Sequence, residues 1–114
     1  MLSGFEKLNE TEVAELKKKH SLPFVIELHA VDKYAGEGFA YVKPVTRHQY
    51  AKFKSDAAER DSSAVYNMLC DVLVHPAMER LGPVYEEYPG FVDQLGDVAL
   101  KTTGVMADIT AKKL

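Results

Sequence analysis

The sequence predicts a single α+β domain, built from a short N-terminal helix, a β-hairpin and then a bundle of three to four helices. Three observations predict this class. Apolar and polar residues alternate over two neighbouring runs, 24–31 and 39–45, as in strands with one buried face. After Pro44 the apolar residues recur at intervals of three and four, as in helices. The chain has 114 residues, 46% of them hydrophobic, which suits one domain with one core.

The first expected helix covers residues 9–20, with the sequence NETEVAELKKKH. Its first turn is acidic and its last turn carries three lysines, an order that complements the helix dipole. Asn9 or Thr11 is expected to cap its start. Residues 1–8, which precede it, show no periodic pattern and are expected to be flexible.

A β-hairpin is expected next, with strand 24–31 joined to strand 39–45 through a turn at 32–38. Two glycines in the turn permit positive φ angles. Pro44 has no N–H group to donate, so the second strand ends there or lies at an edge. Because a two-stranded sheet is marginal alone, either helices cover one of its faces or another subunit extends it.

Two helices are expected after the hairpin. Thr46 and Gln49 form a capping-box pattern, and the helix that they start is expected to reach Glu59. Ser62 or Ser63 is expected to cap the next helix, which is the most apolar of the chain and is therefore expected to be central. Its apolar stripe comprises Val65, Leu69, Val72 and Leu73.

The next stretch, HPAMERLGPVYEEYPG, is punctuated by prolines. Pro76 suits the first turn of a helix. The pair Gly82-Pro83 is expected to kink or split this helix, and Pro89-Gly90 is expected to end it.

The last helix is expected over residues 91–104, where Gly104 is suited to a C-terminal cap. Residues 105–114 are expected to form a flexible tail. The domain therefore spans 1–114, with flexible ends at 1–8 and 105–114.

Composition narrows the classes of protein. Charged residues make up 27% of the chain and the net charge is −3, so nucleic acid is not an expected partner. No apolar run approaches the roughly 20 residues of a membrane span, and the N-terminus lacks the pattern of a secretory signal. We therefore expect a soluble, intracellular protein with no membrane partner. Its single cysteine, Cys70, permits no intrachain disulfide and fits a reducing compartment.

No set of residues has the spacing of a catalytic or metal site. Cys70 lies in the apolar helix and is expected to be a small buried hydrophobe. The stretch Gly36-Glu37-Gly38 lacks the spacing of a phosphate loop. We therefore expect no catalytic residue, no cofactor, no metal and no enzyme activity. The four histidines lie on different expected elements, without metal-ligand spacing: His20, His29, His48 and His75.

The aromatic residues point to protein contacts. They exceed what a helical core of this size needs, and tyrosine is enriched at interfaces. We expect self-association at the hairpin edge through Phe39 and Tyr41, because an open strand edge pairs readily with another chain. A second contact surface is expected at Tyr85, Tyr88 and Phe91.

A hairpin with a glycine-rich turn leads through a proline-bearing junction into the stretch LVHPAMERLGPVYEEYPGFVDQLGDVALKTTG. In that stretch a helix started by proline, a Pro-Gly break and a final helix ending in glycine follow one another. This pattern, over residues 15–104, resembles the tail assembly chaperones of long-tailed bacteriophages and prophages. Lys43 stands where members often carry an arginine after the strand, so no contact residue is transferred from the family.

The resemblance implies a non-enzymatic α+β protein that forms homo-oligomers in the cytoplasm of the bacterial host. It implies binding to the tape measure protein, with the major tail tube protein as a further partner, during tail morphogenesis. Two other functions stay open at this point. One is another structural virion component, such as a head–tail connector or minor tail protein. The other is a small ligand-binding or enzymatic domain.

Overall fold

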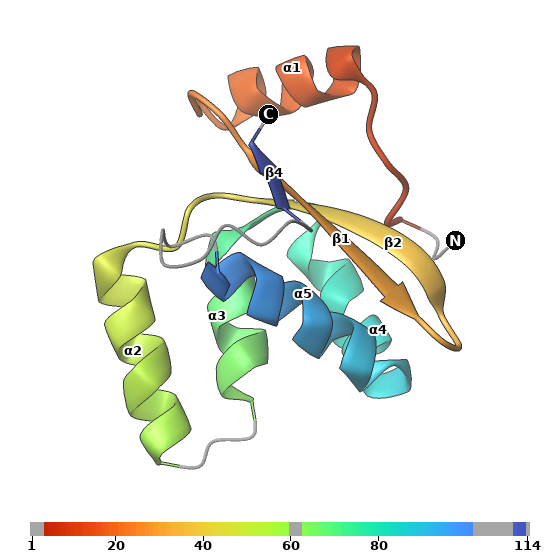
Figure 1. The fold of residues 1–114 in the computed structure, drawn as a ribbon. Coiled ribbons are helices and arrows are strands. Elements are labelled where there is room, and N and C mark those ends of the chain that lie inside the picture. The colour runs from red at the N-terminus through yellow and green to blue at the C-terminus, as the bar shows by residue number, and fades with distance from the viewer. Residues whose placement is uncertain (1–3, 60–62, 102–110, 114) are drawn as a thin grey trace.

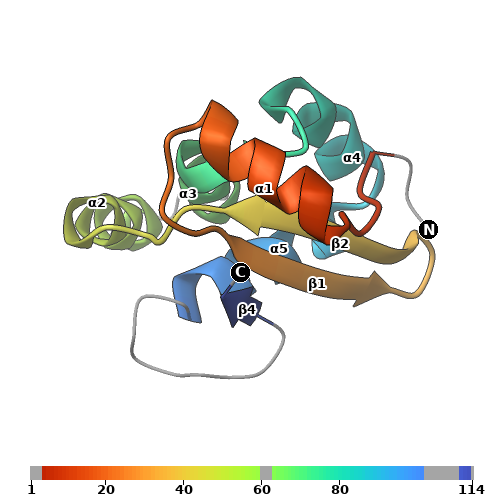
Figure 2. The ribbon, with the colours of Figure 1, turned by 90° about the horizontal axis from the view of Figure 1, so that it is seen from above.

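The computed structural model describes residues 4–59, 63–101 and 111–113 and has an α+β fold (Figure 1). One helix lies on one face of an antiparallel sheet and further helices cover the other face (Figure 2). This confirms the expected class. In chain order the elements are α1 (Glu10–Lys19), β1 (Ile26–Asp32), β2 (Gly36–Val42), α2 (Arg47–Ala58), α3 (Ala64–Val72), β3 (Leu73–His75), the 3₁₀ helix η1 (Met78–Arg80), α4 (Leu81–Glu87), α5 (Pro89–Lys101) and β4 (Ala111–Lys113).

The hairpin of β1 and β2 is tighter than the sequence predicts. Asp32 pairs with Gly36, so β2 begins at Gly36 rather than at residue 39. The carboxylate of Asp32 accepts hydrogen bonds of 2.8 Å from the backbone N–H groups of Tyr34 and Ala35. Gly36 has a φ of 85°, which a residue without a β-carbon adopts at little cost. The side chain of Asp32 therefore closes the turn locally.

The sheet has four strands in the order β3-β2-β1-β4, and not only the two strands of the hairpin. β3 pairs with β2 at Tyr41 and Val42, and β4 pairs with β1 between Ile26 and Leu28. Leu73, which we expected on a helix, is the first residue of β3. The chain thus extends the hairpin on both sides with its own strands.

Parts of both terminal segments, which we expect to be flexible, contact the rest of the domain. Phe5 is fully buried and packs edge-on against the ring of Phe91. Its carbonyl oxygen accepts a hydrogen bond of 2.7 Å from the N–H of Phe39. At the other end, Ala111–Lys113 pairs with β1 as β4. The rest of these expectations lies outside the described residues: 1–3, 102–110, 114 and the cap at Gly104.

Two helices begin with capping boxes, of which the one at Thr46 is expected from the sequence, whereas for the first helix we expect only a cap at Asn9 or Thr11. Asn9 caps α1, and Thr46 caps α2. The Thr46 hydroxyl accepts from the N–H of Gln49, whose side chain in turn accepts from the N–H of Thr46. α2 nevertheless buries none of its residues and packs mainly against α3. Because burial contributes so little, α2 depends strongly on its cap.

The central helix is α5, and not α3 as we expected. α5 lies between α3 and α4 and packs against β1 (Figure 1). Its close approach to α3 depends on a glycine, because a β-carbon at Gly96 would lie 2.2 Å from Cγ1 of Val65. The buried residues of α5 are Phe91, Val92, Leu95, Gly96, Val98 and Ala99.

Two of the three prolines of the C-terminal third have different roles from those expected, whereas α4 ends before Pro89 as expected. Pro76 follows a cis peptide bond and lies between β3 and η1, outside any helix. Pro83 is in the first turn of α4, where an N–H group has no helical partner, so it does not split this helix. Pro89 is the first residue of α5, directly after the end of α4.

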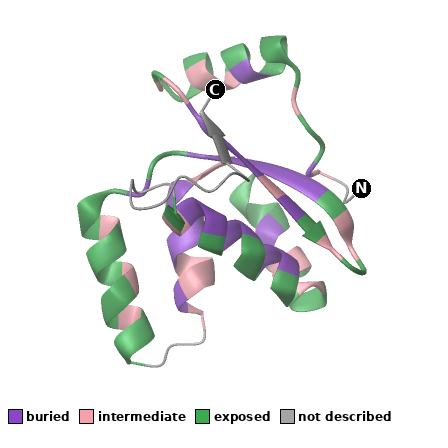
Figure 3. Cartoon of the chain, in the orientation of Figure 1, coloured by how far each residue is buried: buried purple, intermediate pink, exposed green. Residues whose placement is uncertain are grey.

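The sheet separates two hydrophobic clusters (Figure 3). The larger cluster lies between the sheet and the helices α3, α4 and α5. The alternation of β1 directs Ile26, Leu28 and Ala30 into it, as the sequence predicts. The smaller cluster lies between the sheet and α1 and consists of Val13, Val25, Phe39 and Tyr41.

Candidate protein-binding surface

Three of the five aromatic residues expected at a contact surface are buried within the chain: Phe39, Tyr41 and Phe91. The ring of Phe91 lies 5.4 Å from that of Phe5, in the larger cluster. Phe39 stacks on the imidazole of His29, with ring centroids 4.5 Å apart. Because their own chain covers these side chains, the expectation that they form an open surface is wrong.

Tyr41 forms a polar centre in the layer beneath α1. Its hydroxyl donates a hydrogen bond of 2.9 Å to Oε1 of Glu27 and accepts one of 2.9 Å from the N–H of Leu8. Burial raises the pKa of Tyr41 to about 12, and the Glu27 carboxylate adds to the increase. The strand edge beside Tyr41, which we expected to be open, pairs with His75 of β3.

The free side of β1 is also covered in part. The side-chain amide of Gln94, on α5, accepts a hydrogen bond of 3.0 Å from the N–H of Val31 and donates one of 3.1 Å to its carbonyl oxygen. This pair of bonds reproduces what a neighbouring strand would offer at that position. The edges of the hairpin are therefore poor sites for the addition of another strand.

Tyr85 lies instead at a groove between α3 and α4. Its ring stacks on that of Tyr66, with centroids 4.6 Å apart and an angle of 15° between the planes. The groove has a volume of about 490 Å³ and is open to solvent. Tyr88 does not line this groove; it is half-buried against the larger hydrophobic cluster. The α3–α4 groove is lined by Ser63, Tyr66, Asn67, Gly82, Pro83, Tyr85 and Glu86.

The sequence predicts Tyr85 at a contact surface but does not predict Tyr66 as its partner. The two tyrosines lie on different helices, and their stacking depends on how α3 and α4 pack. The one sequence feature that indicates a groove here is Gly82-Pro83, because these two residues place little side-chain bulk on α4 beside Tyr85.

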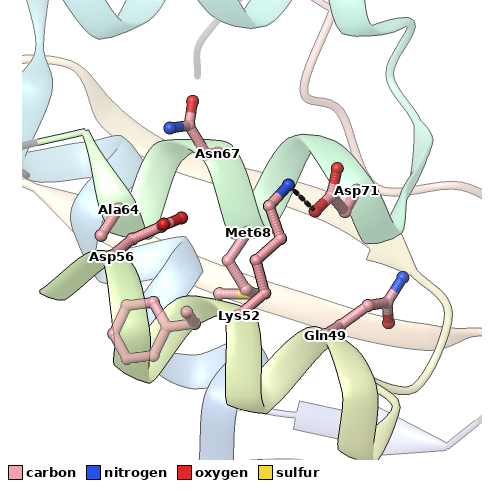
Figure 4. Close-up of a pocket in the computed structure, with 8 residues that line it drawn as sticks. Gln49, Lys52, Asp56, Ala64, Asn67, Met68 and Asp71 are labelled. Carbon is pink, nitrogen blue, oxygen red and sulfur yellow. Dashed lines mark ion pairs between the residues drawn. The ribbon is translucent and has the colours of Figure 1, made fainter.

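A narrower cleft lies on the other side of α3, against α2 (Figure 4). Lys52 reaches across it to Asp71, with 3.6 Å between Nζ and Oδ2. Both side chains are exposed, so this ion pair contributes little to stability. Asn67 lines both the cleft and the α3–α4 groove, so the cleft and the groove lie next to each other on the surface of α3.

Two groups beside the groove, Cys70 and Tyr66, favour their neutral forms. Burial raises the pKa of the Cys70 thiol, and the thiolate is the nucleophilic form. Burial also raises the pKa of Tyr66, whose hydroxyl interacts with the Cys70 thiol. In the part of the chain that the structure describes, no three His, Cys, Asp or Glu side chains are arranged to hold a metal ion. The groove thus offers aromatic contact and hydrogen bonds.

Comparison with known proteins identifies the family. Residues 16–112 match the family described as Domain of unknown function (DUF6848), and the chain belongs to it. The fold is similar to the solved structure of the uncharacterised protein rbstp2171 from Bacillus stearothermophilus, with a TM-score of 0.64 and 20% sequence identity. That likeness covers 87% of this chain and 98% of the other, and at this identity it concerns the fold alone.

No curated protein matches the chain. Among the described residues, none of the helices has both the length and the apolar character needed to cross a membrane.

Proposed function

We propose that this protein is a non-enzymatic, self-associating protein that binds other proteins, and that it acts as a tail assembly chaperone of a bacteriophage or prophage. In this role it binds the tape measure protein, and also the major tail tube protein, in the cytoplasm of the bacterial host. The observation that carries the proposal is the stacked pair of Tyr66 and Tyr85 at the α3–α4 groove. The order of hairpin, proline-bearing junction and helices supports the same assignment.

The chemistry of the groove supports a helical protein partner. Tyrosine rings offer large contact areas and few rotatable bonds, so little side-chain entropy is lost on binding. Asn67 and Glu86 supply hydrogen-bonding groups beside the two rings. The apolar stripe of a long amphipathic helix, such as a tape measure protein contains, fits a surface of this kind. Weak contacts repeated along such a helix sum by multivalency, yet each is displaced when tube subunits arrive.

Co-expression with the tape measure protein encoded nearest to the gene tests this function. We expect the tape measure protein to stay soluble and to co-purify with the chain. Tyr85→Ser is expected to weaken capture about tenfold, as for other aromatic contact residues. Tyr34→Ser is the matched control, because Tyr34 lies in the hairpin loop and is 80% exposed. A tape measure protein that stays insoluble beside the unaltered chain contradicts the proposal.

Two further measurements test self-association and distinguish a chaperone from a structural component of the virion. Size-exclusion chromatography with light scattering is expected to show an oligomer, and a strict monomer at high concentration contradicts self-association. Mass spectrometry of mature particles is expected to show no copies of the chain. Copies in the particle indicate a structural virion component, such as a connector or minor tail protein, in place of a chaperone.

A further inference from the structure

The N-terminal segment crosses the molecule before the sheet begins (Figure 2). We call residues 4–19 the arm. Phe5 of the arm inserts into the larger hydrophobic cluster, and Val13 of α1 rests in the smaller one. Between them, the N–H of Leu8 donates to the hydroxyl of Tyr41. The surface that the arm covers, which we call the seat, comprises Val25, Phe39, Tyr41 and Val74.

α1 packs lightly on the seat. Val13 is the one residue of α1 that is buried. Open space lies on both sides of the helix, with a cavity of about 380 Å³ beside Glu27 and one of about 220 Å³ beside His75. The arm is therefore held mainly at Phe5 and Leu8, and α1 adds little burial of its own.

The turn that joins the arm to the sheet is strained. The N–H groups of Ser21 and Leu22 donate to the carbonyl oxygens of Lys18 and Lys17, the pattern of a Schellman motif. Glycine usually occupies the position of Ser21, whose φ is 54°. Serine is disfavoured in this left-handed region, so the turn gains by straightening.

We propose that the arm is exchangeable, and that the seat of one copy of this chain takes up the arm of a second copy. Apart from the two hydrogen bonds of the turn, every contact that the arm makes within one chain is reproduced between two copies. Exchange therefore requires that the arm leaves its own seat and that the turn at Ser21 opens. Straightening removes the positive φ of Ser21 in each copy. This inference rests on the self-association in the proposed function and deepens it by naming the contact. Phe39 and Tyr41 then take part in self-association as buried members of the seat.

The residues that match the family model are consistent with an arm that precedes the shared domain. The match begins at residue 16, after Phe5, Leu8 and Val13. The residues of the seat and Leu16 of the arm lie within the matched range, whereas Leu8 and Val13 lie ahead of that range. Most of the arm thus lies outside the shared domain and covers a surface inside it.

Disulfide trapping between two distinguishable copies tests the exchange. A β-carbon at Gly38 lies 3.3 Å from Cβ of Phe5, close to the roughly 3.8 Å of natural disulfides. A copy with Phe5→Cys is mixed with a tagged copy with Gly38→Cys, both with Cys70→Ser, and is oxidised after incubation. The arm with Phe5→Cys binds more weakly because it lacks the buried ring, but oxidation makes each exchange irreversible, so we expect a covalent heterodimer to accumulate on a non-reducing gel. Tyr34→Cys in place of Gly38→Cys is the matched control for random collision.

A second measurement uses the unaltered chain, because a cysteine at Gly38 also crowds the ring of Phe91. A fluorescent peptide of residues 1–20 is titrated with the full chain, and its anisotropy is expected to rise to saturation. A Phe5→Ala peptide is expected to bind about a hundredfold more weakly, since it lacks the buried ring. A chain locked by Phe5→Cys and Gly38→Cys in one molecule is expected to take up no peptide.

A heterodimer above background, or saturable uptake of the peptide, supports exchange, and the absence of both overturns it. These outcomes are distinct from failure of the proposed function. A chain that oligomerises in light scattering but shows neither result keeps that function and loses arm exchange. A chain that captures no tape measure protein but takes up the peptide keeps arm exchange and loses the chaperone function.

Discussion

The hydroxyl of Tyr41 lies 2.9 Å from Oε1 of Glu27, so that two polar side chains meet in the buried layer between α1 and the sheet. The same hydroxyl accepts the N–H of Leu8. A single phenol thus links β1, β2 and the N-terminal segment, and its removal leaves two polar groups without a partner.

We expect Tyr41→Phe to lower the free energy of unfolding at neutral pH by about 1–3 kcal/mol, because Glu27 and Leu8 each lose a buried partner. Chemical denaturation measures this change. Tyr34→Phe, at an exposed position, is expected to stay within about 0.5 kcal/mol of the unaltered chain. Equal stability of the two variants would show that the network contributes nothing.

Tyr41 also predicts a loss of stability in alkali. Its pKa is about 12 in the folded chain, against an ordinary value of 10. Above pH 10 the unfolded chain releases this proton while the folded chain keeps it, so stability is lost as the pH rises towards 12. We expect the free energy of unfolding to fall less steeply with pH in Tyr41→Phe. Parallel slopes in the two proteins over this range contradict the assignment.

Gly96 and Val65 mark the closest approach of α5 to α3. Alanine in a helix interior is usually favoured over glycine by about 1 kcal/mol. Here the added β-carbon would lie 2.2 Å from Cγ1 of Val65, so we expect Gly96→Ala to lower stability by about 1–2 kcal/mol. Gly90→Ala, in the same helix with its nearest contact at 3.8 Å, is expected to be neutral or stabilising.

A double-mutant cycle provides the decisive control for this contact. Val65→Ala is expected to lower stability alone and to recover part of the loss in the Gly96→Ala background. Strict additivity of the two changes, measured by thermal or chemical denaturation, would rule out the direct clash.

Thr46 is expected to control α2 separately from the rest of the chain. Because α2 buries no residue, loss of its cap by Thr46→Ala is expected to destabilise it by about 1 kcal/mol. Amide hydrogen exchange measures this as roughly fivefold faster exchange in α2 with little change in the sheet. Ser55→Ala, an exposed change in the same helix, is the control and is expected to leave exchange almost unchanged. Uniform acceleration across the whole chain would contradict the local role.

His75 predicts a loss of stability in mild acid. Burial lowers its pKa below the ordinary value of 6.5, although Glu12 and Glu6 oppose the change. The unfolded chain therefore takes up this proton at a higher pH than the folded chain, and stability falls as the pH drops below about 6.5. Denaturation at about pH 7.5 and about pH 5.5 measures the loss. His75→Gln is expected to reduce it, whereas His20→Gln, at the exposed end of α1, is expected to keep it.

Capping patterns and hydrophobic periodicity predict the elements whose formation depends on residues close together in the sequence. The cap at Asn9 and the capping box at Thr46 depend on contacts three residues apart, and both form as expected. The strands β3 and β4 were not predicted, because each has three residues and shows no clear alternation. Their pairing depends on partners far away in the sequence.

At the candidate surface, the burial of the aromatic residues likewise depends on segments that are distant in the sequence. Nothing in the residues around Tyr41 or Phe91 reveals whether another part of the chain covers them. Phe5, which covers the ring of Phe91, comes from a segment that we expected to be flexible. The stack of Tyr66 on Tyr85 likewise depends on the packing of two helices.

The α+β class, the hairpin and the caps at Asn9 and Thr46 follow from the sequence alone, because hydrophobic periodicity and local hydrogen bonding act over a few residues. The expected cap at Ser62 or Ser63 does not form through a side chain, since Ser63 at the start of α3 makes no side-chain cap bond. Tertiary structure decided which faces are closed. It added β3 and β4 to the hairpin, buried Phe39, Tyr41 and Phe91, and left the α3–α4 groove open. The physical reason is that burial depends on contacts between distant segments, which no local pattern records.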